Sequence, residues 1–256
     1  MRASERNDDT SMVGRIAAIL NAFQPRDDDL GISELARRTG LPKSTVSRII
    51  TGLVEHQFLE RAGTGVRLGL RLFELGESAT RPRDLRKLAL ASMSDLRNAV
   101  NLTVHLAVLE GTEVVYIEIL PARDTPPLPS RVGGRMPAHA TGVGKALVAW
   151  SSPDVIETVL SGGLVARGPN TITDPERFKR ELSRIRNAGV AYEREESGPG
   201  VACAATAVRS ADGHPVVALS AAGWSRDFDV RRVGFAVQTA AQGLSRQIAR
   251  RPGLRL

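Results

Sequence analysis

The stretch ISELARRTGLPKSTVSRIITGLVEHQFLERAGTGVRL, residues 32–68, decides the fold of the first part of the chain. Its first helical pattern is expected to be capped by Ser33 and to end at Gly40, which supplies the positive φ of a helix terminus. Pro42 suits the first turn of a second helix, where its missing N–H is not needed. That helix has apolar residues at the spacing of one helical face, namely Val46, Ile49, Ile50, Leu53 and Val54. The stretch therefore predicts two helices joined by a short turn.

The residues on either side complete a small domain. Two short strands are predicted at 58–61 and 66–68, with a tight turn between them that contains two glycines. Upstream, apolar residues spaced three and four apart predict another helix, and Ile19 with the outer face of that helix is a candidate contact between two copies of the domain. Three helices and a hairpin indicate a winged helix-turn-helix.

The rest of the chain predicts a different architecture. A helical connector leads to Arg81 and Pro82, a plausible domain boundary, and beyond it helical and strand patterns alternate. The loop at 121–130 holds four prolines. We expect a sheet that is covered by helices on one side. The predicted segments are 1–11, a disordered N-terminus; 12–69, the winged domain, with its helix-turn-helix at about 32–51 and its wing at about 58–68; 70–80, a linker helix; and 81–256, an α/β sensor-type domain. The fold class is therefore α+β.

The distribution of charge along the chain is more informative about its partners than the net charge is. The formal net charge of +7 and a pI near 10.4 invite a polyanionic partner. However, residues 1–78 contain eleven Lys or Arg and eleven Asp or Glu, so the excess comes from residues 79–256, with 24 cations and 17 acids. Within 37–67, in contrast, six cations face only two acids. This local excess lies on the predicted helix-turn-helix and wing.

A solvated surface is the ordinary explanation for such a charge cluster. Here the cations share the exposed face of the second quoted helix with short hydroxyl side chains, a face small enough to enter a major groove. We therefore expect contact with double-stranded DNA through eight residues: Arg38, Lys43, Ser44, Thr45, Ser47, Arg48, Thr64 and Arg67.

The single cysteine, Cys203, excludes an intramolecular disulfide framework and suits a reducing cytoplasm. No export signal and no apolar run long enough for a membrane span are evident, so a cytoplasmic location without membrane contact is expected. The pair Gly144 and Lys145 resembles the end of a phosphate loop, but His139 and Ala146 occupy positions that such a loop requires for glycine and Ser or Thr. The four histidines have no metal-ligand spacing. We expect neither a catalytic site nor a metal or other cofactor.

The residues as an ordered set resemble the IclR family of bacterial transcriptional regulators. The resemblance rests on residues 32–61, followed by VRLGLRLFELG, and on later segments that include VHLAVLEGTEVVYIE, VGGRMPAHATGVGKALVAW and GVACAATAV. It covers nearly the whole chain after residue 11. It implies a dimer or tetramer that binds operator DNA through winged helices and senses a small molecule in a C-terminal GAF-like domain.

The same resemblance implies where the effector binds. Carried over residue by residue, the family's pocket falls on His139, Ala140, Thr141, Gly142, Glu193, Cys203, Ser220 and Ala222. Small side chains and the amides at the start of a helix suit a small organic acid. Glu193 stands where Asp is usual, Arg194 where a second acid is common and Ala222 where Ser is frequent, which suggests a differently shaped, less polar pocket.

These observations predict a ligand-responsive transcriptional regulator of a metabolic or catabolic operon, with a repressor favoured by the resemblance. Two alternatives stay open. One is an enzyme fused to a winged-helix domain, with Cys203 as nucleophile and His139 as base, or a metal held by these two residues and Glu193. The other is a DNA-binding protein without a ligand. An apolar, filled cavity between the last strands and the loop after Arg131 would favour the second alternative. The interpretation of Glu193 and Arg194 as solvated loop charges also stays open.

Overall fold

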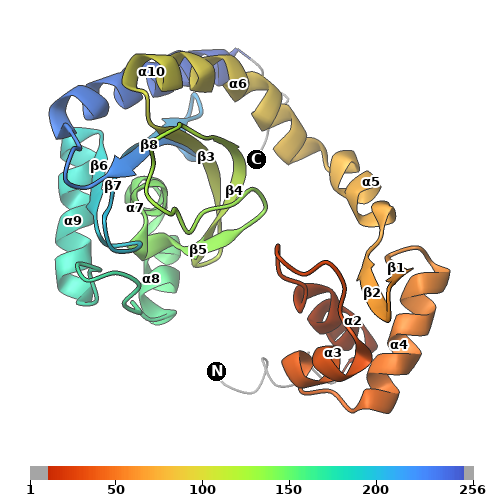
Figure 1. The fold of residues 1–256 in the computed structure, drawn as a ribbon. Helices are drawn as coiled ribbons and strands as arrows, with labels where there is room; N and C mark the ends of the chain where they lie inside the picture. Colours follow the sequence, from red (N-terminus) through yellow and green to blue (C-terminus); the bar gives the residue numbers. More distant parts are fainter. Residues whose placement is uncertain (1–10, 251–256) are drawn as a thin grey trace. The chain divides into compact units, whose positions relative to one another are not determined.

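Helix α2 (Met12–Asn21) is the first element of the computed structural model, which describes residues 11–250 (Figure 1). The predicted disorder of residues 1–10 lies outside the described residues. Ser11, which the prediction placed in the same segment, is the N-cap of α2, and its side chain accepts a hydrogen bond from the amide of Gly14 at 2.9 Å. Contacts divide the chain into two units, Met1–Thr80 and Arg81–Leu256.

The first unit is a winged helix-turn-helix. After α2 come α3 (Ile32–Thr39) and α4 (Lys43–Glu55), then the antiparallel wing of β1 (Leu59–Ala62) and β2 (Gly65–Leu68), and finally α5 (Leu70–Ser78). The apolar face of α4 packs in a core with α2, α3 and the wing. The buried residues of this core are Ile19, Leu30, Leu35, Val46, Ile49, Ile50, Leu53, Leu59 and Val66.

Three local predictions can be compared with this unit. Gly40 has φ 69° at the end of α3, as expected. The N-cap of α3 is Gly31 rather than Ser33, and no side chain caps this helix, so that prediction is wrong. Ile19 is fully buried in its own domain core and cannot contact a second copy, whereas Met12 and Val13 of the same helix are exposed.

The second unit is built on a six-stranded sheet in the order β5-β4-β3-β8-β7-β6. All neighbouring strands are antiparallel. The strands are β3 (Thr103–Glu110), β4 (Glu113–Leu120), β5 (Arg135–Pro137), β6 (Ala191–Arg194), β7 (Val201–Arg209) and β8 (Pro215–Trp224). The helical elements are α6 (Thr80–Val100), the 3₁₀ turn η1 (Ala138–Ala140), α7 (Gly142–Ala149), α8 (Pro153–Ser161), α9 (Pro175–Ala188) and α10 (Val230–Ala249).

Helices cover both faces of this sheet, so the expectation of one covered side is wrong (Figure 1). One apolar core joins the sheet to α6 and α10, with Met93, Val237 and Leu244 at its centre. The opposite core joins it to α7, α8 and α9, with Leu147 and Phe178 among its buried residues. Because α7 is short and buried along its whole length, its N-terminal end is held close to the strands. Among residues 11–250, no helix is long and apolar enough to cross a membrane.

Candidate functional site

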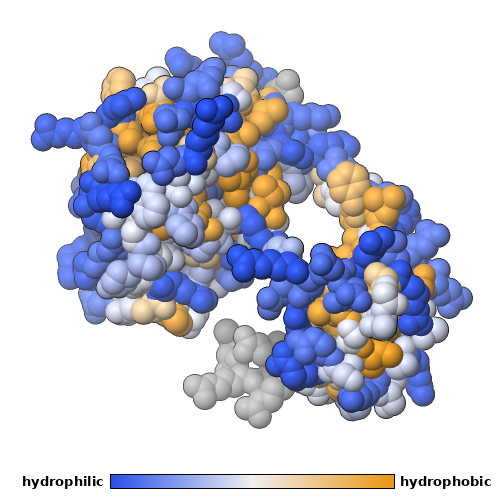
Figure 2. Space-filling view, in the orientation of Figure 1, coloured by the Kyte–Doolittle hydropathy of each residue, from blue (hydrophilic) through white to orange (hydrophobic). Residues whose placement is uncertain are grey.

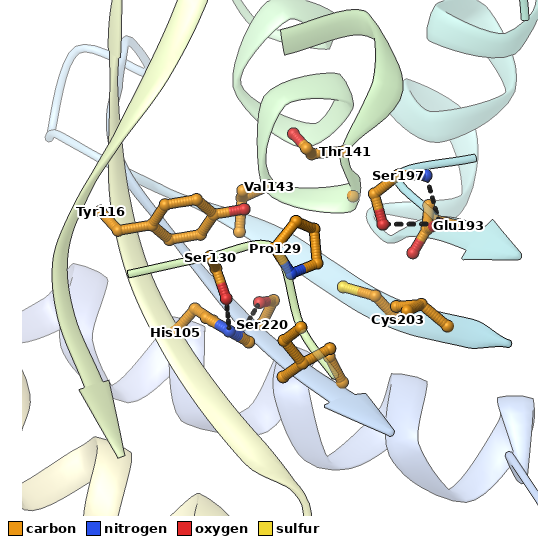
Figure 3. Close-up of a pocket in the computed structure, with 14 residues that line it drawn as sticks. His105, Tyr116, Pro129, Ser130, Thr141, Val143, Glu193, Ser197, Cys203 and Ser220 are labelled. Carbon is orange, nitrogen blue, oxygen red and sulfur yellow. Dashed lines mark hydrogen bonds between the residues drawn. The ribbon is translucent and has the colours of Figure 1, made fainter. Parts of the chain in front are cut away.

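A cavity in the second unit lies between the sheet and the start of α7, and the loop at 128–130 closes it (Figure 3). The polar groups around it come from β3, β4, β6, β8, α7 and the loop after β6. They belong to His105, Tyr116, Thr141, Glu193, Ser197 and Ser220. Segments far apart in the sequence thus meet at one site.

The register of the sheet places the strand residues of the site in two rows. Glu193 pairs with Cys203, and Cys203 pairs with Ala222, so these three residues lie side by side across β6, β7 and β8. Two residues further along the strands, Ser220 pairs with His105 of β3. Because alternate residues of a strand face the same side, both rows face α7.

The start of α7 closes the other side of the cavity. Thr141 is its N-cap, and the Thr141 hydroxyl accepts a hydrogen bond from the amide of Gly144 at 3.1 Å. A Cβ atom on Gly142 would lie 2.8 Å from Sγ of Cys203, so only glycine permits this close approach of helix and strand. The positive end of a short helix dipole therefore lies directly over β7.

The loop at 128–130 occupies most of the remaining space, and we refer to it as the strap. The Ser130 hydroxyl and Nε2 of His105 form a hydrogen bond of 2.9 Å, and Nδ1 of His105 lies 3.4 Å from the Ser220 hydroxyl (Figure 3). Pro129 lies between Tyr116 and Cys203 in this view. The free volume of the cavity is about 30 Å³, about that of one water molecule. The strap therefore leaves little free space in the cavity.

Burial sets the protonation of the groups in the cavity. It lowers the pKa of His105 to about 4, so this imidazole is neutral near pH 7. It raises the pKa of the Cys203 thiol and of the Tyr116 phenol, which therefore also stay neutral. The exception is Glu193, whose pKa burial raises to about 7.

Glu193 is held in place by the turn that follows β6. Its Oε1 accepts hydrogen bonds from the amides of Glu196 and Ser197, at 2.7 and 2.9 Å, and from the Ser197 hydroxyl at 3.1 Å. These bonds favour the charged form but are outweighed by desolvation, because the residue is only 3% exposed. Glu193 is thus no solvated loop charge, whereas Arg194 beside it is exposed.

Six of the eight expected effector residues line the cavity: Thr141, Gly142, Glu193, Cys203, Ser220 and Ala222. His139 and Ala140 do not. The turn η1 directs His139 away from the sheet, so that its Nε2 bonds to the carbonyl oxygen of Val165 at 3.0 Å and its ring meets the edge of Phe178. Because His139 does not join Cys203 in the cavity, neither the catalytic pair nor the metal set of the alternative reading is assembled.

The sequence prediction missed other residues of the cavity. These are His105, Tyr116, Leu128, Pro129, Ser130, Val143, Ser197 and Val201. A signal existed for His105, a histidine within an apolar strand, and for the strap, a proline-rich segment beside the quoted pocket motif. The described residues contain no group of His, Cys, Asp and Glu that could hold a metal ion. Lys145 is fully buried in an ion pair with Glu196, 2.6 Å away, and does not end a phosphate loop.

In the first unit, α4 presents most of the expected DNA contacts on the side opposite its buried face. Lys43, Ser44 and Arg48 are exposed, and Thr45 and Ser47 are half-buried beside them. On the wing, Thr64 and Arg67 are exposed. Arg67 pairs with Glu60 at 3.2 Å across the two wing strands, an exposed pair that adds little stability and is easily exchanged.

Arg38 is differently placed. Its guanidinium makes two hydrogen bonds to Asp27, at 2.6 and 3.1 Å, one to Glu34 at 2.7 Å and one to the carbonyl oxygen of Ala22 at 2.9 Å. Its side chain is 21% exposed. The arginine therefore ties α3 to the segment after α2, and its donors are committed within the domain.

A winged helix-turn-helix with an exposed, cationic and hydroxyl-rich helix, on the same chain as a domain with a polar cavity, defines the class of ligand-sensing DNA-binding proteins. Comparison with protein families gives the same result. The family described as "Bacterial transcriptional regulator IclR C-terminal" matches residues 77–249, and the "IclR helix-turn-helix domain" matches residues 12–63. The chain belongs to the IclR family of DNA-binding transcriptional regulators, with a C-terminal GAF-like effector domain, and not to an enzyme family.

Individual relatives match along most of their length. The HTH-type transcriptional regulator XynR of Escherichia coli is 31% identical over 91% of this chain and 94% of its own. The transcriptional repressor IclR of E. coli is 28% identical over 80% of this chain and 77% of its own. Among solved structures, an IclR homologue from Microbacterium hydrocarbonoxydans complexed with 4-hydroxybenzoate is 33% identical, with a TM-score of 0.86 over 94% of this chain and all of the other.

Proposed function

We propose that this regulator is a repressor of a metabolic or catabolic operon and that a small organic acid in the cavity releases it from operator DNA. The observation that carries the proposal is the arrangement of the cavity. A helix N-terminus, Thr141 and Ser220 meet there with a neutral His105, and a strap rather than a core side chain fills the centre. The homologue bound to 4-hydroxybenzoate supports an organic acid as the ligand class.

In the proposed complex, the carboxylate of the effector lies at the start of α7. Amides of a first helical turn and the dipole favour an anion there, and the Thr141 hydroxyl adds a polar group. Tyr116 and Val143 supply apolar surface for the body of the ligand. Ala222, where the family often has serine, removes one hydroxyl, so an effector with an apolar body is favoured.

The strap has to move outward when the effector enters. A volume of about 30 Å³ is far below the roughly 300–1,000 Å³ of small-molecule sites. The hydrogen bond between Ser130 and His105 is the polar contact that opening breaks. Effector binding then replaces strap contacts and shifts the protein between two conformations.

For the DNA contact, we propose the seven residues that lie on one face or on the wing and have no buried partners. They are Lys43, Ser44, Thr45, Ser47, Arg48, Thr64 and Arg67. Arg38 is left out because its donors are occupied within the domain. The short hydroxyl side chains allow close approach to base edges, and the cations reach phosphates.

We further propose that the chain acts in the cytoplasm as a homodimer or homotetramer. One winged domain covers one half-site, so a dimer suits a roughly palindromic operator. Figure 2 shows an apolar patch on α5, where Leu70, Phe73 and Leu75 are 68%, 63% and 44% exposed. Exposed apolar residues gathered on one short helix are typical of an association surface.

A DNA-binding protein without a ligand is the competing candidate, and the small free volume of the cavity is the observation that favours it. Titration calorimetry of the full chain against a panel of aromatic and aliphatic acids, starting with 4-hydroxybenzoate, separates the two. The proposal predicts saturable binding of at least one acid by the native protein. Cys203→Leu, which fills the cavity from β7, should remove it. Binding that persists in Cys203→Leu would place the acid elsewhere, and a panel without any binder would support the competing candidate.

A further inference from the structure

The cationic side chains that the structure describes in the second unit are not among the residues that line the effector cavity. Some of them gather in an open groove of about 480 Å³ between α9 and β6. Four arginines line this groove: Arg177, Arg180 and Arg184 from α9 and Arg194 from β6. Because the groove and the cavity share no lining residue, the groove is a candidate site in its own right.

The arginines converge because of the geometry of the two elements. Positions 177, 180 and 184 are three and four residues apart and share one face of α9. Arg194 lies at the end of β6, an edge strand of the sheet, and its exposed side chain lines the same groove. The side-chain amide of Asn170 donates to the carbonyl oxygen of Arg194 at 3.2 Å, which fixes the strand end at the rim of the groove.

The two carboxylates that line the groove, Glu181 and Glu196, are already paired with cations. Lys145 is fully buried, and its Nζ lies 2.6 Å from Oε1 of Glu196 and 3.5 Å from Oε1 of Glu181. Arg184 pairs with the same oxygen of Glu181 at 2.8 Å. Within the part of the chain that the structure describes, the side chains of Arg177, Arg180 and Arg194 have no ion-pair partner. Three guanidinium groups are therefore available to a ligand.

We propose that this groove is a second ligand site, which binds a small molecule through a phosphate group. Guanidinium groups present N–H donors in a planar fork that matches the oxygens of phosphate, and several of them can share one dianion. A groove of about 480 Å³ lies within the size range of small-molecule sites. A monocarboxylate offers only two oxygens and suits the single helix terminus of the effector cavity better.

Residues 193–197 lie between the two sites and connect them. Glu193 in the cavity accepts a hydrogen bond from the amide of Glu196, and Glu196 lines the groove. Lys145 also donates to the carbonyl oxygen of Tyr192 at 2.8 Å, so the whole turn is held by one buried ammonium group. A ligand that repositions Arg194 and this turn changes the position of Glu193. This turn is therefore the segment that the two sites share.

Calorimetry of the full chain with glucose 6-phosphate, glucose and inorganic phosphate tests the second site. Glucose 6-phosphate should bind and glucose should not. The double variant Arg177→Ala/Arg180→Ala should lower the affinity at least tenfold. A matched double variant of exposed arginines on α10, Arg231→Ala/Arg246→Ala, removes the same charge and should leave the affinity unchanged.

The remaining outcomes are equally decisive. Inorganic phosphate that binds as tightly as glucose 6-phosphate, with the same loss in Arg177→Ala/Arg180→Ala, supports the site with phosphate itself as the ligand. Equal losses in both double variants, or no binding of either phosphate compound, would overturn it. If Arg177→Ala/Arg180→Ala weakens only the binding of double-stranded DNA, the groove binds the DNA backbone and the proposal is wrong. Cys203→Leu should retain glucose 6-phosphate binding; if it abolishes that binding, the compound occupies the effector cavity, and the second site fails while the proposed function stands.

Discussion

Arg48 is the exposed cation on the face of α4 that we expect to enter the major groove. Arg48→Ala should weaken binding to operator DNA by about 1–3 kcal/mol, the size of one good bidentate contact with a base. Fluorescence anisotropy at fixed salt, with an operator selected by the protein from random DNA, measures this loss. Arg71→Ala, an exposed arginine of α5 paired with Glu74, is the matched control. Unchanged affinity and sequence preference in Arg48→Ala would contradict the assignment.

We expect Glu193 to make effector binding depend on pH. Its pKa is raised to about 7 by burial, and the neighbouring His105, Cys203 and Tyr116 stay neutral in this range. A carboxylate ligand favours protonated Glu193, so its affinity should rise as the pH falls from about 8 to 6.

Calorimetry in buffers of different ionisation enthalpy should show uptake of a proton on binding. Glu193→Gln should bind the acid with an affinity that no longer changes over this interval. A native protein whose affinity is constant between these pH values would refute the role given to Glu193. The same raised pKa affects folding: the contribution of protonated Glu193 to stability is complete below its ordinary pKa near 4.5 and is lost as the pH rises through about 7.

Most kinds of residue in the effector cavity could be predicted from the sequence, whereas individual residues such as His105 could not. Small residues, the cysteine and the acid on the sheet were found because the resemblance aligns them with a known pocket. His105 was not singled out, because β3 is a central strand whose first six residues are all buried. Without an exposed side, the sequence pattern does not reveal which face a residue points to. His139, which the prediction included, lies outside the cavity, because the direction of a side chain in a 3₁₀ turn is not readable from spacing.

At the scale of elements, Arg38 links α3 to the segment after α2. Arg38→Ala should lower the melting temperature of the winged domain, because it leaves Asp27 and part of Glu34 without their partner. The guanidinium lowers the pKa of Asp27 and, together with Arg37, that of Glu34 to about 2. This stabilisation is present above the ordinary pKa values of 3.8 and 4.5 and is lost as the pH falls toward the lowered ones.

Acid unfolding followed by circular dichroism should therefore begin at a higher pH in Arg38→Ala than in the native protein. Arg26→Ala, an exposed arginine one residue before Asp27, is the control. If Arg38→Ala has native acid and thermal stability but weakened DNA binding, Arg38 contacts DNA, as the sequence predicted.

We expect the strap to control entry to the cavity. Ser130→Ala removes its hydrogen bond to His105 and destabilises the closed state by about 0.5–1.5 kcal/mol. Effector affinity should then increase by up to about tenfold, as measured by calorimetry, because less free energy is needed to open the cavity. Thr125→Ala in the same loop should have no effect. Weaker effector binding in Ser130→Ala would mean that the hydroxyl contacts the ligand instead of holding the strap.

The longer elements and the wing were predictable, whereas the short edge strands of the six-stranded sheet were not. Helices α2, α4, α9 and α10 and strands β3, β4, β7 and β8 have clear apolar periodicity or apolar runs. Strands β5 and β6 have three and four residues and lie at the edges of the sheet, too short for an apolar pattern. The second helical layer was missed because a fully buried helix such as α7 has no polar face to mark its orientation.

At the scale of the whole molecule, the two units divide the function. The winged unit carries a local positive face although residues 1–78 sum to zero charge. The excess positive charge of the sensor unit is not expected to contact DNA. We assign part of it to the groove between α9 and β6. Ligand and DNA bind different units, so control depends on a difference in DNA affinity between the effector-free and effector-bound protein.

Release of operator DNA by the effector is the direct test of whether the cavity controls DNA binding. The measurement is the anisotropy of a labelled operator bound to the full chain during titration with an acid that binds by calorimetry, for the native protein and for Cys203→Leu. We predict that the acid releases DNA from the native protein. Cys203→Leu should bind DNA with native affinity and keep it at every acid concentration. Release of DNA from Cys203→Leu at native acid concentrations, or no effect of a bound acid on the native complex, would contradict this prediction.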